Sequence, residues 1–264
     1  MIDQIKKISN KGFFHIFGSN IINKIIQFSS SIFLVRILTK EEFGLFSYSQ
    51  NLLMFFLLLN GLGVVSGMLQ YGSETDNNQY RNSYFKYGIK VGLLFNLVVG
   101  IIIVFYSDFF PLKIQRAEPI LTSMFLLPIV IFLFESIQIY FRASLENKKF
   151  SFLNTLNTFL LFICSVVGAY FFGVLGLVSF MYIGYFITII IGVILLKSVV
   201  MDVLKAPKLL KKVKKEFMKF SIISSFNNAV SQLLYIIDIF LIGLILMDEK
   251  IIASYKIATL IPFA

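Results

Sequence analysis

Long apolar runs are the feature that most constrains this chain. Runs long enough to cross roughly 30 Å of hydrocarbon, about 20 residues each, lie at 13–38, 43–70, 84–106, 119–141, 151–172, 174–196 and 217–246, and an eighth begins near residue 250. Hydrophobic residues make up 58% of the 264, far more than a soluble domain of this length carries. The sequence therefore predicts an all-α fold, a polytopic membrane helical bundle of seven spans and a partial eighth.

The distribution of basic residues predicts the orientation of these spans. With the N-terminus inside, the cytoplasmic segments hold Lys6, Lys7, Lys11, Arg81, Lys86, Lys90, Arg142, Lys148, Lys149, Lys197, Lys205, Lys208, Lys211, Lys212, Lys214, Lys215 and Lys219. The outer segments hold Arg36, Lys40, Lys113, Arg116, Lys250 and Lys256, and Lys24 lies within a span. This asymmetry follows the positive-inside rule and places the N-terminus in the cytoplasm. Alternate loops thus account for most of the net charge of +10, so we expect no nucleic-acid partner.

Three regions follow from the spans: a first six-span lobe at 1–196, a basic cytoplasmic linker at 197–216, and the start of a second lobe at 217–264. The lysine-rich loop around Pro207 is expected to act as a hinge between lobes. Its lysines can contact anionic headgroups of membrane lipids, or dock a partner such as a polysaccharide assembly enzyme.

A weak internal repeat supports this division. An offset of 207 positions aligns Glu41 with Asp248 and Tyr48 with Tyr255. The two copies would have the same orientation, which is a known plan of transporters with a substrate site at the repeat interface. The second copy stops early, so we expect the chain to be roughly 60% of a protein of about twelve spans.

Polar residues form a stripe along the first span. At about 100° per residue, one helical face carries Asn20, Asn23, Lys24, Gln27 and Ser31, while isoleucines and phenylalanines occupy the other. On insertion scales, exposing an ammonium to hydrocarbon costs about 2.5–3.5 kcal/mol. The stripe must therefore face other helices or water, as one wall of a polar cavity.

The seventh span repeats this pattern. Its polar face carries Asn227, Asn228, Ser231, Gln232, Tyr235 and Asp238. The fourth span adds Glu135, Gln138 and Arg142 at helical spacing, after Pro128, which is expected to kink it. Other asparagines within spans are expected to make interhelical hydrogen bonds, namely Asn51, Asn60, Asn96, Asn154 and Asn157.

Glu135 and Asp238 are the carboxylates that lie well inside predicted spans. A buried carboxylate can exchange protons or bind Na⁺, so both are candidates for coupling transport to an H⁺ or Na⁺ gradient. Asp238 can instead be a solvated or paired carboxylate near the outer boundary. Glu135 can instead pair with a neighbouring cation or stay protonated.

Lys24 suits a different role, because a fixed cation among amide donors can bind an anionic headgroup such as a diphosphate. Lys256 can supply a second charge. The predicted substrate-binding set is Asn20, Asn23, Lys24, Gln27, Asn228, Gln232 and Lys256. The alternatives are a salt bridge from Lys24 to Glu135 or Asp238, and snorkelling of Lys256 to the interface.

Enzyme chemistry has no visible machinery in the sequence. With one cysteine, Cys164, and one histidine, His15, the usual disulfide and His- or Cys-based metal sites are excluded. No nucleophile and base, Gly-rich phosphate loop or catalytic carboxylate pair can be assembled. We expect neither a cofactor nor a catalytic residue.

Three segments carry a resemblance to a known family. The block Leu34–Gln50, the following Asn60-Gly-Leu-Gly63, and Asp238–Gly243 with Tyr255 are similar to segments of the polysaccharide-biosynthesis flippases that move O-antigen and capsule units. The resemblance implies a fold related to the multidrug and toxin extrusion transporters, with two six-helix lobes around a cavity that opens alternately to each side. It also implies a bacterial cytoplasmic membrane location and an undecaprenyl-diphosphate-linked oligosaccharide as substrate.

Several other functions compete with this expectation. An ion-coupled drug exporter of the same fold predicts an acidic cavity, which Lys24 opposes, and a lipid II flippase differs in its cargo. A membrane glycosyltransferase requires a loop with acidic catalytic residues, whereas the longest loop here is lysine-rich. A scaffold that docks assembly enzymes through this loop, or an inactive truncated chain, is a further alternative.

Overall fold

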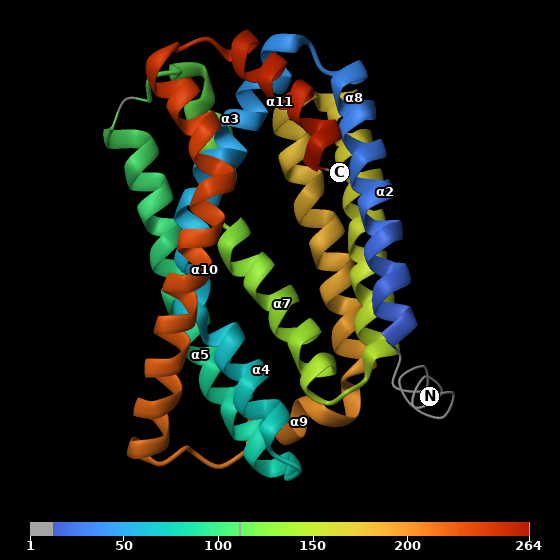
Figure 1. The fold of residues 1–264 in the computed structure, drawn as a ribbon, viewed down its shortest axis with the longest axis vertical. Helices are drawn as coiled ribbons and strands as arrows, with labels where there is room; N and C mark the ends of the chain where they lie inside the picture. Colours follow the sequence, from blue (N-terminus) through green and yellow to red (C-terminus); the bar gives the residue numbers. More distant parts are fainter. Residues whose placement is uncertain (1–12, 111, 264) are drawn as a thin grey trace.

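The computed structural model describes residues 13–110 and 112–263, and these residues form helices and no strands, which confirms the predicted all-α class (Figure 1). The long helices run alongside one another. In chain order the helices are α2 (Phe13–Ile37), α3 (Lys40–Phe56), η1 (Leu57–Gly63), α4 (Val64–Glu74), α5 (Asn78–Phe109), η2 (Gln115–Ala117), α6 (Glu118–Ser123), α7 (Leu127–Ala143), α8 (Asn147–Leu195), α9 (Lys197–Lys205), α10 (Lys211–Ile245) and α11 (Glu249–Phe263). We call the end with α9 the lysine-rich end and the opposite one the far end.

The helix α8 folds back on itself at a single glycine. Gly173 has φ 64° and ψ −150°, a conformation that favours glycine because it has no Cβ. Beyond it the chain returns antiparallel: a Cβ on Gly168 would lie 2.4 Å from the Gly176 carbonyl oxygen, and Gly192 lies beside Leu153. The two limbs correspond to the runs predicted at 151–172 and 174–196.

The number of membrane spans is only partly settled by length and composition. Among the described residues, four helical stretches are long and apolar enough, at Lys40–Glu74, Asn78–Phe109, Asn147–Leu195 and Lys211–Ile245. The pair α6 and α7, bent by 43°, makes a fifth if it forms one span. Pro128 lies in the first turn of α7 after this bend, as the predicted kink requires. Because α8 counts once although it has two limbs, the total of seven stays a prediction.

The second predicted span is not the continuous helix that the run 43–70 suggested. It breaks at η1, where Asn60 has φ −42° and ψ 119° and where Gly61, Leu62 and Gly63 all have positive φ. Two glycines allow this turn, and Leu62 is held in a conformation that is unfavourable for a residue with a side chain. Hydropathy does not reveal such a break, because Asn60 is the one polar residue between 54 and 65 and the others are apolar or glycine.

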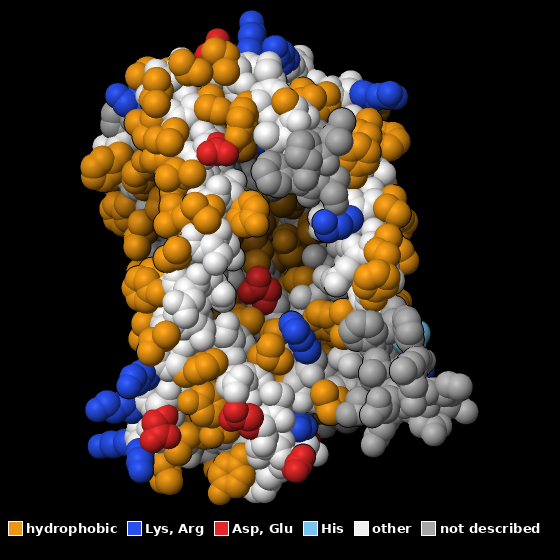
Figure 2. All heavy atoms as spheres, viewed as in Figure 1, with side chains coloured by type: hydrophobic (Ala, Val, Ile, Leu, Met, Phe, Trp, Pro, Cys, Tyr) orange, Lys and Arg blue, Asp and Glu red, His pale blue; other side chains and the backbone are white. Residues whose placement is uncertain are grey.

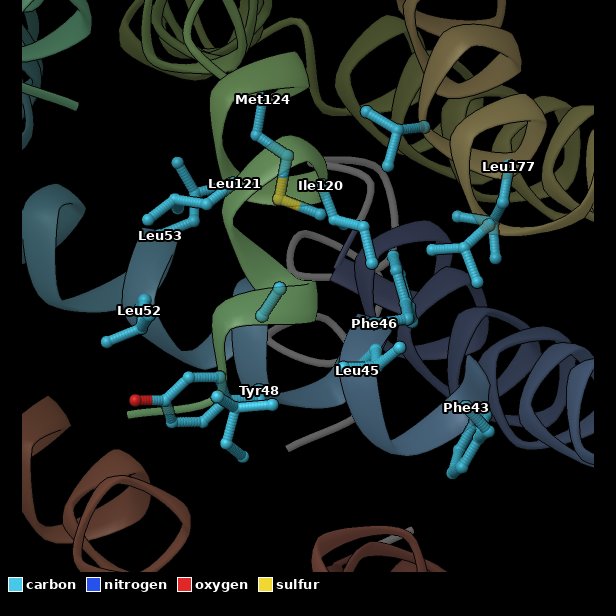
Figure 3. Close-up of a cluster of buried hydrophobic side chains, with 14 of the residues drawn as sticks. Phe43, Leu45, Phe46, Tyr48, Leu52, Leu53, Ile120, Leu121, Met124 and Leu177 are labelled. Carbon is cyan, nitrogen blue, oxygen red and sulfur yellow. The ribbon is translucent and has the colours of Figure 1, made fainter. Parts of the chain in front are cut away.

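The largest core cluster lies towards the far end, where α3 packs against α6 and α8. Phe46 and Leu53 of α3 belong there to one buried cluster with Met124 and Leu177 (Figure 3). The first turn of α3 is fixed by a capping box, in which Thr39 Oγ1 accepts from the Glu42 amide and the Glu42 carboxylate accepts from the Thr39 amide. The core thus anchors α3, the helix that begins the broken span.

The basic linker is more ordered than the expected loop. Its first part is the helix α9, and α10 begins at Lys211, so only residues 206–210 are extended. Lys86 Nζ donates to the carbonyl oxygens of Leu204 at 2.6 Å and Ala206 at 2.8 Å, which satisfies carbonyls at the end of α9. Lys86, predicted as one of many cytoplasmic charges, therefore ties the linker to α5.

The two copies of the weak repeat meet at the far end. A Cβ on Gly44 would lie 1.9 Å from the Glu249 carbonyl oxygen, so α3 and α11 touch backbone to backbone. Ion pairs surround this contact: Arg116 lies 3.2 Å from Glu41 and 3.3 Å from Glu249, and Lys250 lies 2.8 Å from Glu41. These contacts join the start of α3 to the start of α11, the two segments that the weak repeat aligns.

Candidate functional site

A cavity of 480 Å³ opens among α2, α3, α10 and α11. In Figure 2 this face is hollowed between the two columns of helices, with acidic and basic side chains around the hollow. The residues that line the cavity are Lys24, Gln27, Phe28, Ser31, Gln50, Met54, Tyr235, Ile236, Asp238, Ile239, Tyr255, Lys256 and Thr259. Three of the five residues in the predicted polar stripe of α2, Lys24, Gln27 and Ser31, therefore line this cavity.

A second cavity of 370 Å³ continues the first towards α8. The two share four lining residues, Gln27, Ser31, Gln50 and Lys256. The second is bounded by several polar side chains of α8, among them Asn154, Asn157, Thr158 and Ser165. The two cavities therefore adjoin, and polar side chains line them from α10 to α8.

The first cavity brings together three charged side chains. Lys24 and Lys256 supply two positive charges, and Asp238 supplies one negative charge. Tyr255, which the repeat aligns with Tyr48, donates its hydroxyl to Asp238 Oδ2 at 2.6 Å. The cavity carries an excess of one positive formal charge, and its carboxylate already has one hydrogen-bond donor.

The other predicted substrate contacts lie elsewhere. Asn23 is 5% exposed, and its Oδ1 has no hydrogen-bond partner among the described residues. It is rotated about 100° from Lys24 and so leaves the cavity wall. Asn20, Asn228 and Gln232 are exposed but line neither cavity, because all three lie closer to the lysine-rich end than the residues of α2 and α10 that do. A polar stripe along a whole helix therefore includes residues that do not border a cavity.

Glu135 lies in a second polar place, apart from Asp238. Its Oε2 accepts from Asn60 Nδ2 at 2.8 Å, and Asn60 Oδ1 accepts from Asn96 Nδ2 at 2.8 Å. Asn96 Oδ1 in turn accepts from the Gly61 amide at 3.1 Å. This chain of hydrogen bonds joins α7, η1 and α5 at the break in the second span. We call Glu135, Asn60, Asn96 and the Gly61 amide the Glu135 network.

Several of the predicted interhelical asparagines make such bonds. Asn60 and Asn96 do so in the Glu135 network, Asn51 donates to the Ile236 carbonyl oxygen at 2.9 Å, and Asn154 accepts from Gln138 at 3.0 Å. Sequence analysis did not link Asn60 to Glu135. The signal available was the Asn60-Gly-Leu-Gly63 segment, in which two glycines beside a polar residue mark a possible break within an apolar run.

Comparison with known proteins places the chain in a family. It matches the family model described as polysaccharide biosynthesis protein over residues 9–261. The chain belongs to this family. No curated protein and no solved structure matches it. Membership in the polysaccharide biosynthesis family confirms the resemblance seen in the sequence, and together with the apolar helices it is consistent with a multi-pass membrane protein that acts as a transporter.

Proposed function

We propose that this protein is a flippase, which moves an undecaprenyl-diphosphate-linked oligosaccharide across the bacterial cytoplasmic membrane by alternating access. The observation that carries the proposal is the polar cavity with Lys24 and Lys256 at its wall. Ammonium groups bind phosphate oxygens through charge-assisted hydrogen bonds, and the amides of Gln27 and Gln50 match sugar hydroxyls. Family membership supports a role in polysaccharide biosynthesis.

The arrangement of the helices supports a route for the lipid tail. No Cα atom in the described part of α2 lies within 8 Å of one in α10, although both helices line the same cavity. The two helices are therefore not packed against each other, and each carries exposed apolar residues, such as Ile25 of α2 and Phe226 of α10. A headgroup can enter the cavity while its isoprenoid tail stays in the bilayer, so the tail never crosses water.

The test is the variant Lys24→Ala, assayed for surface glycan at matched protein levels. Loss of one charge-assisted hydrogen bond of roughly 1.5 kcal/mol reduces substrate binding about tenfold. Lys113→Ala is the matched control, because Lys113 is exposed and lies outside both cavities. Export by Lys24→Ala equal to that of Lys113→Ala would refute the role of Lys24 as the diphosphate contact. Purified lipid II and purified lipid-linked oligosaccharide, offered in parallel in vesicles, separate these two cargos.

A drug exporter is the second candidate, and Asp238 is the observation that favours it. This carboxylate borders the cavity, where a cationic drug would find a negative charge. Efflux of a cationic dye that is lost in Asp238→Asn and kept in Lys24→Ala would support export of drugs. If the protein is a flippase, Lys24→Ala should instead lose more transport than Asp238→Asn.

A further inference from the structure

Glu135 is a carboxylate in the middle of α7, and the described part of the chain gives it no basic partner. The described residues place no Lys, Arg or His within 4.0 Å of its oxygens, and its one side-chain hydrogen bond comes from Asn60. Tyr185 of α8 is the titratable group that faces it from a neighbouring helix, and the facing groups of η1 and α5 are uncharged amides. An unpaired negative charge at membrane depth is costly, so a small cation is needed to offset it.

The groups around Glu135 are held tightly in place. Phe132, one turn before Glu135, packs into the gap between Gly61 and Gly92: a Cβ on Gly61 would lie 2.8 Å from its ring, and one on Gly92 would lie 2.0 Å from it. The Asn60 side chain is fixed at both ends by Glu135 and Asn96. The carboxylate and the break therefore have one well-defined mutual arrangement.

The same break contacts α10, which follows the linker. A Cβ on Gly63 would lie 2.2 Å from the Ser221 carbonyl oxygen, and one on Gly67 would lie 2.3 Å from Ser221 Oγ. Gly63 lies three residues from Asn60. The Glu135 network thus lies next to the close contact between the first lobe and α10.

We propose that Glu135 binds a monovalent cation, H⁺ or Na⁺, and that Asn60 links its occupancy to the contact between η1 and α10. A proton on a carboxylate oxygen turns that oxygen from an acceptor into a donor, and Na⁺ occupies its lone pairs. Either cation offsets the negative charge of the carboxylate and so weakens the charge-assisted hydrogen bond that Glu135 Oε2 accepts from Asn60. When Asn60 is released, the strained backbone at Leu62 relaxes and Gly63 shifts against Ser221. The inference deepens the proposed function by assigning the coupling ion to this network.

The first experiment measures the position of α10 without any substrate. Spin labels at Asp76→Cys and Lys212→Cys, in a Cys164→Ser background in lipid nanodiscs, report the distance between the α4–α5 turn and the start of α10. It is measured at pH 8 with K⁺, at pH 8 with Na⁺ and at pH 5.5 with K⁺. A change in distance with Na⁺ at pH 8 identifies a sodium site, and a change only at pH 5.5 identifies a proton site.

Variants then assign the change to Glu135. Glu135→Gln is expected to give one distance in all three buffers, while the matched control Glu146→Gln, an exposed carboxylate past the end of α7, responds as the parent does. If Glu135→Gln fails to fold, Glu135→Asp serves, and its response should need a higher cation concentration. The same response in Glu135→Gln as in the parent, or no response in the parent, would overturn the proposal.

Asn60→Ala separates cation binding from its linkage to α10. If the site binds Na⁺, Na⁺ at about 100 times Kd should raise the melting temperature of the parent by roughly 5 °C. If the site binds a proton, the melting temperature is compared between pH 8 and pH 5.5 instead. Asn60→Ala should keep at least half of this rise and lose the change in label distance. If the distance between the labels still changes in Asn60→Ala as it does in the parent, Asn60 does not link cation binding to the position of α10. No glycan is needed for these measurements, so they can fail while Lys24→Ala still reduces export, and they can succeed while Lys24→Ala leaves export unchanged.

Discussion

Gly44 offers a direct test of the contact between the two repeat copies. In Gly44→Ala the new Cβ would lie 1.9 Å from the Glu249 carbonyl oxygen, whereas an ordinary contact starts at 3.4 Å. The helices α3 and α11 must therefore separate by about 1.5 Å, the difference of these two distances. Backbone shifts of this kind cost about 1–3 kcal/mol. In a chain of this size the melting temperature should fall by roughly 3–10 °C.

The matched control is Gly18→Ala, the same substitution in α2. A Cβ at Gly18 would meet nothing within 4 Å, so only the gain in helix propensity, about 1 kcal/mol, is expected there. Both variants are unfolded by heat in nanodiscs of one lipid composition. Gly18→Ala should melt at or above the temperature of the parent, and Gly44→Ala clearly below it. Equal melting temperatures for the two variants would refute the close approach of α3 and α11.

Two further predictions concern the same end of the molecule. Thr39→Ala removes the capping box of α3 and should lower the free energy of unfolding by about 1 kcal/mol. The measurement is a denaturant titration. The control is Thr259→Ala, because Thr259 does not cap the N-terminus of a helix. Arg116→Ala breaks two exposed ion pairs, so its loss should stay below about 1 kcal/mol and vanish near 1 M salt. A loss from Arg116→Ala that persists in high salt would indicate packing rather than charge.

The helical class and several boundaries could be predicted because they follow from solvation. A backbone in hydrocarbon must satisfy its own hydrogen bonds, so apolar runs of sufficient length become helices. Gly173 shows how far this extends, since the gap between the runs at 151–172 and 174–196 coincides with the residue where α8 turns back. A turn within 151–196 is predicted because this stretch is about twice as long as the roughly 20 residues that one span needs.

The break at η1 could not be predicted in the same way. Its backbone depends on contacts with distant segments: Gly61 packs on Phe132 of α7, and Gly63 packs on Ser221 of α10. The Gly61 amide is satisfied by Asn96 of α5 rather than by its own helix. None of these partners is close in sequence, so periodicity within 43–70 carries no information about them.

The polar residues within the spans show what the cost of burying polar groups can predict. It identifies candidate functional residues, but not the role of each one. The cost of burying a polar group in hydrocarbon requires that each one face a partner or water, and the sequence cannot say which. Lys24 and Gln27 border a cavity, whereas Asn23, one position before Lys24, is buried outside both cavities. Asp238 and Glu135 divide in the same way, one bordering the cavity and the other bonded to a broken span. A charge in the cavity can meet a substrate, while the charge of Glu135 acts on the backbone through Asn60, so the two carboxylates are suited to different tasks.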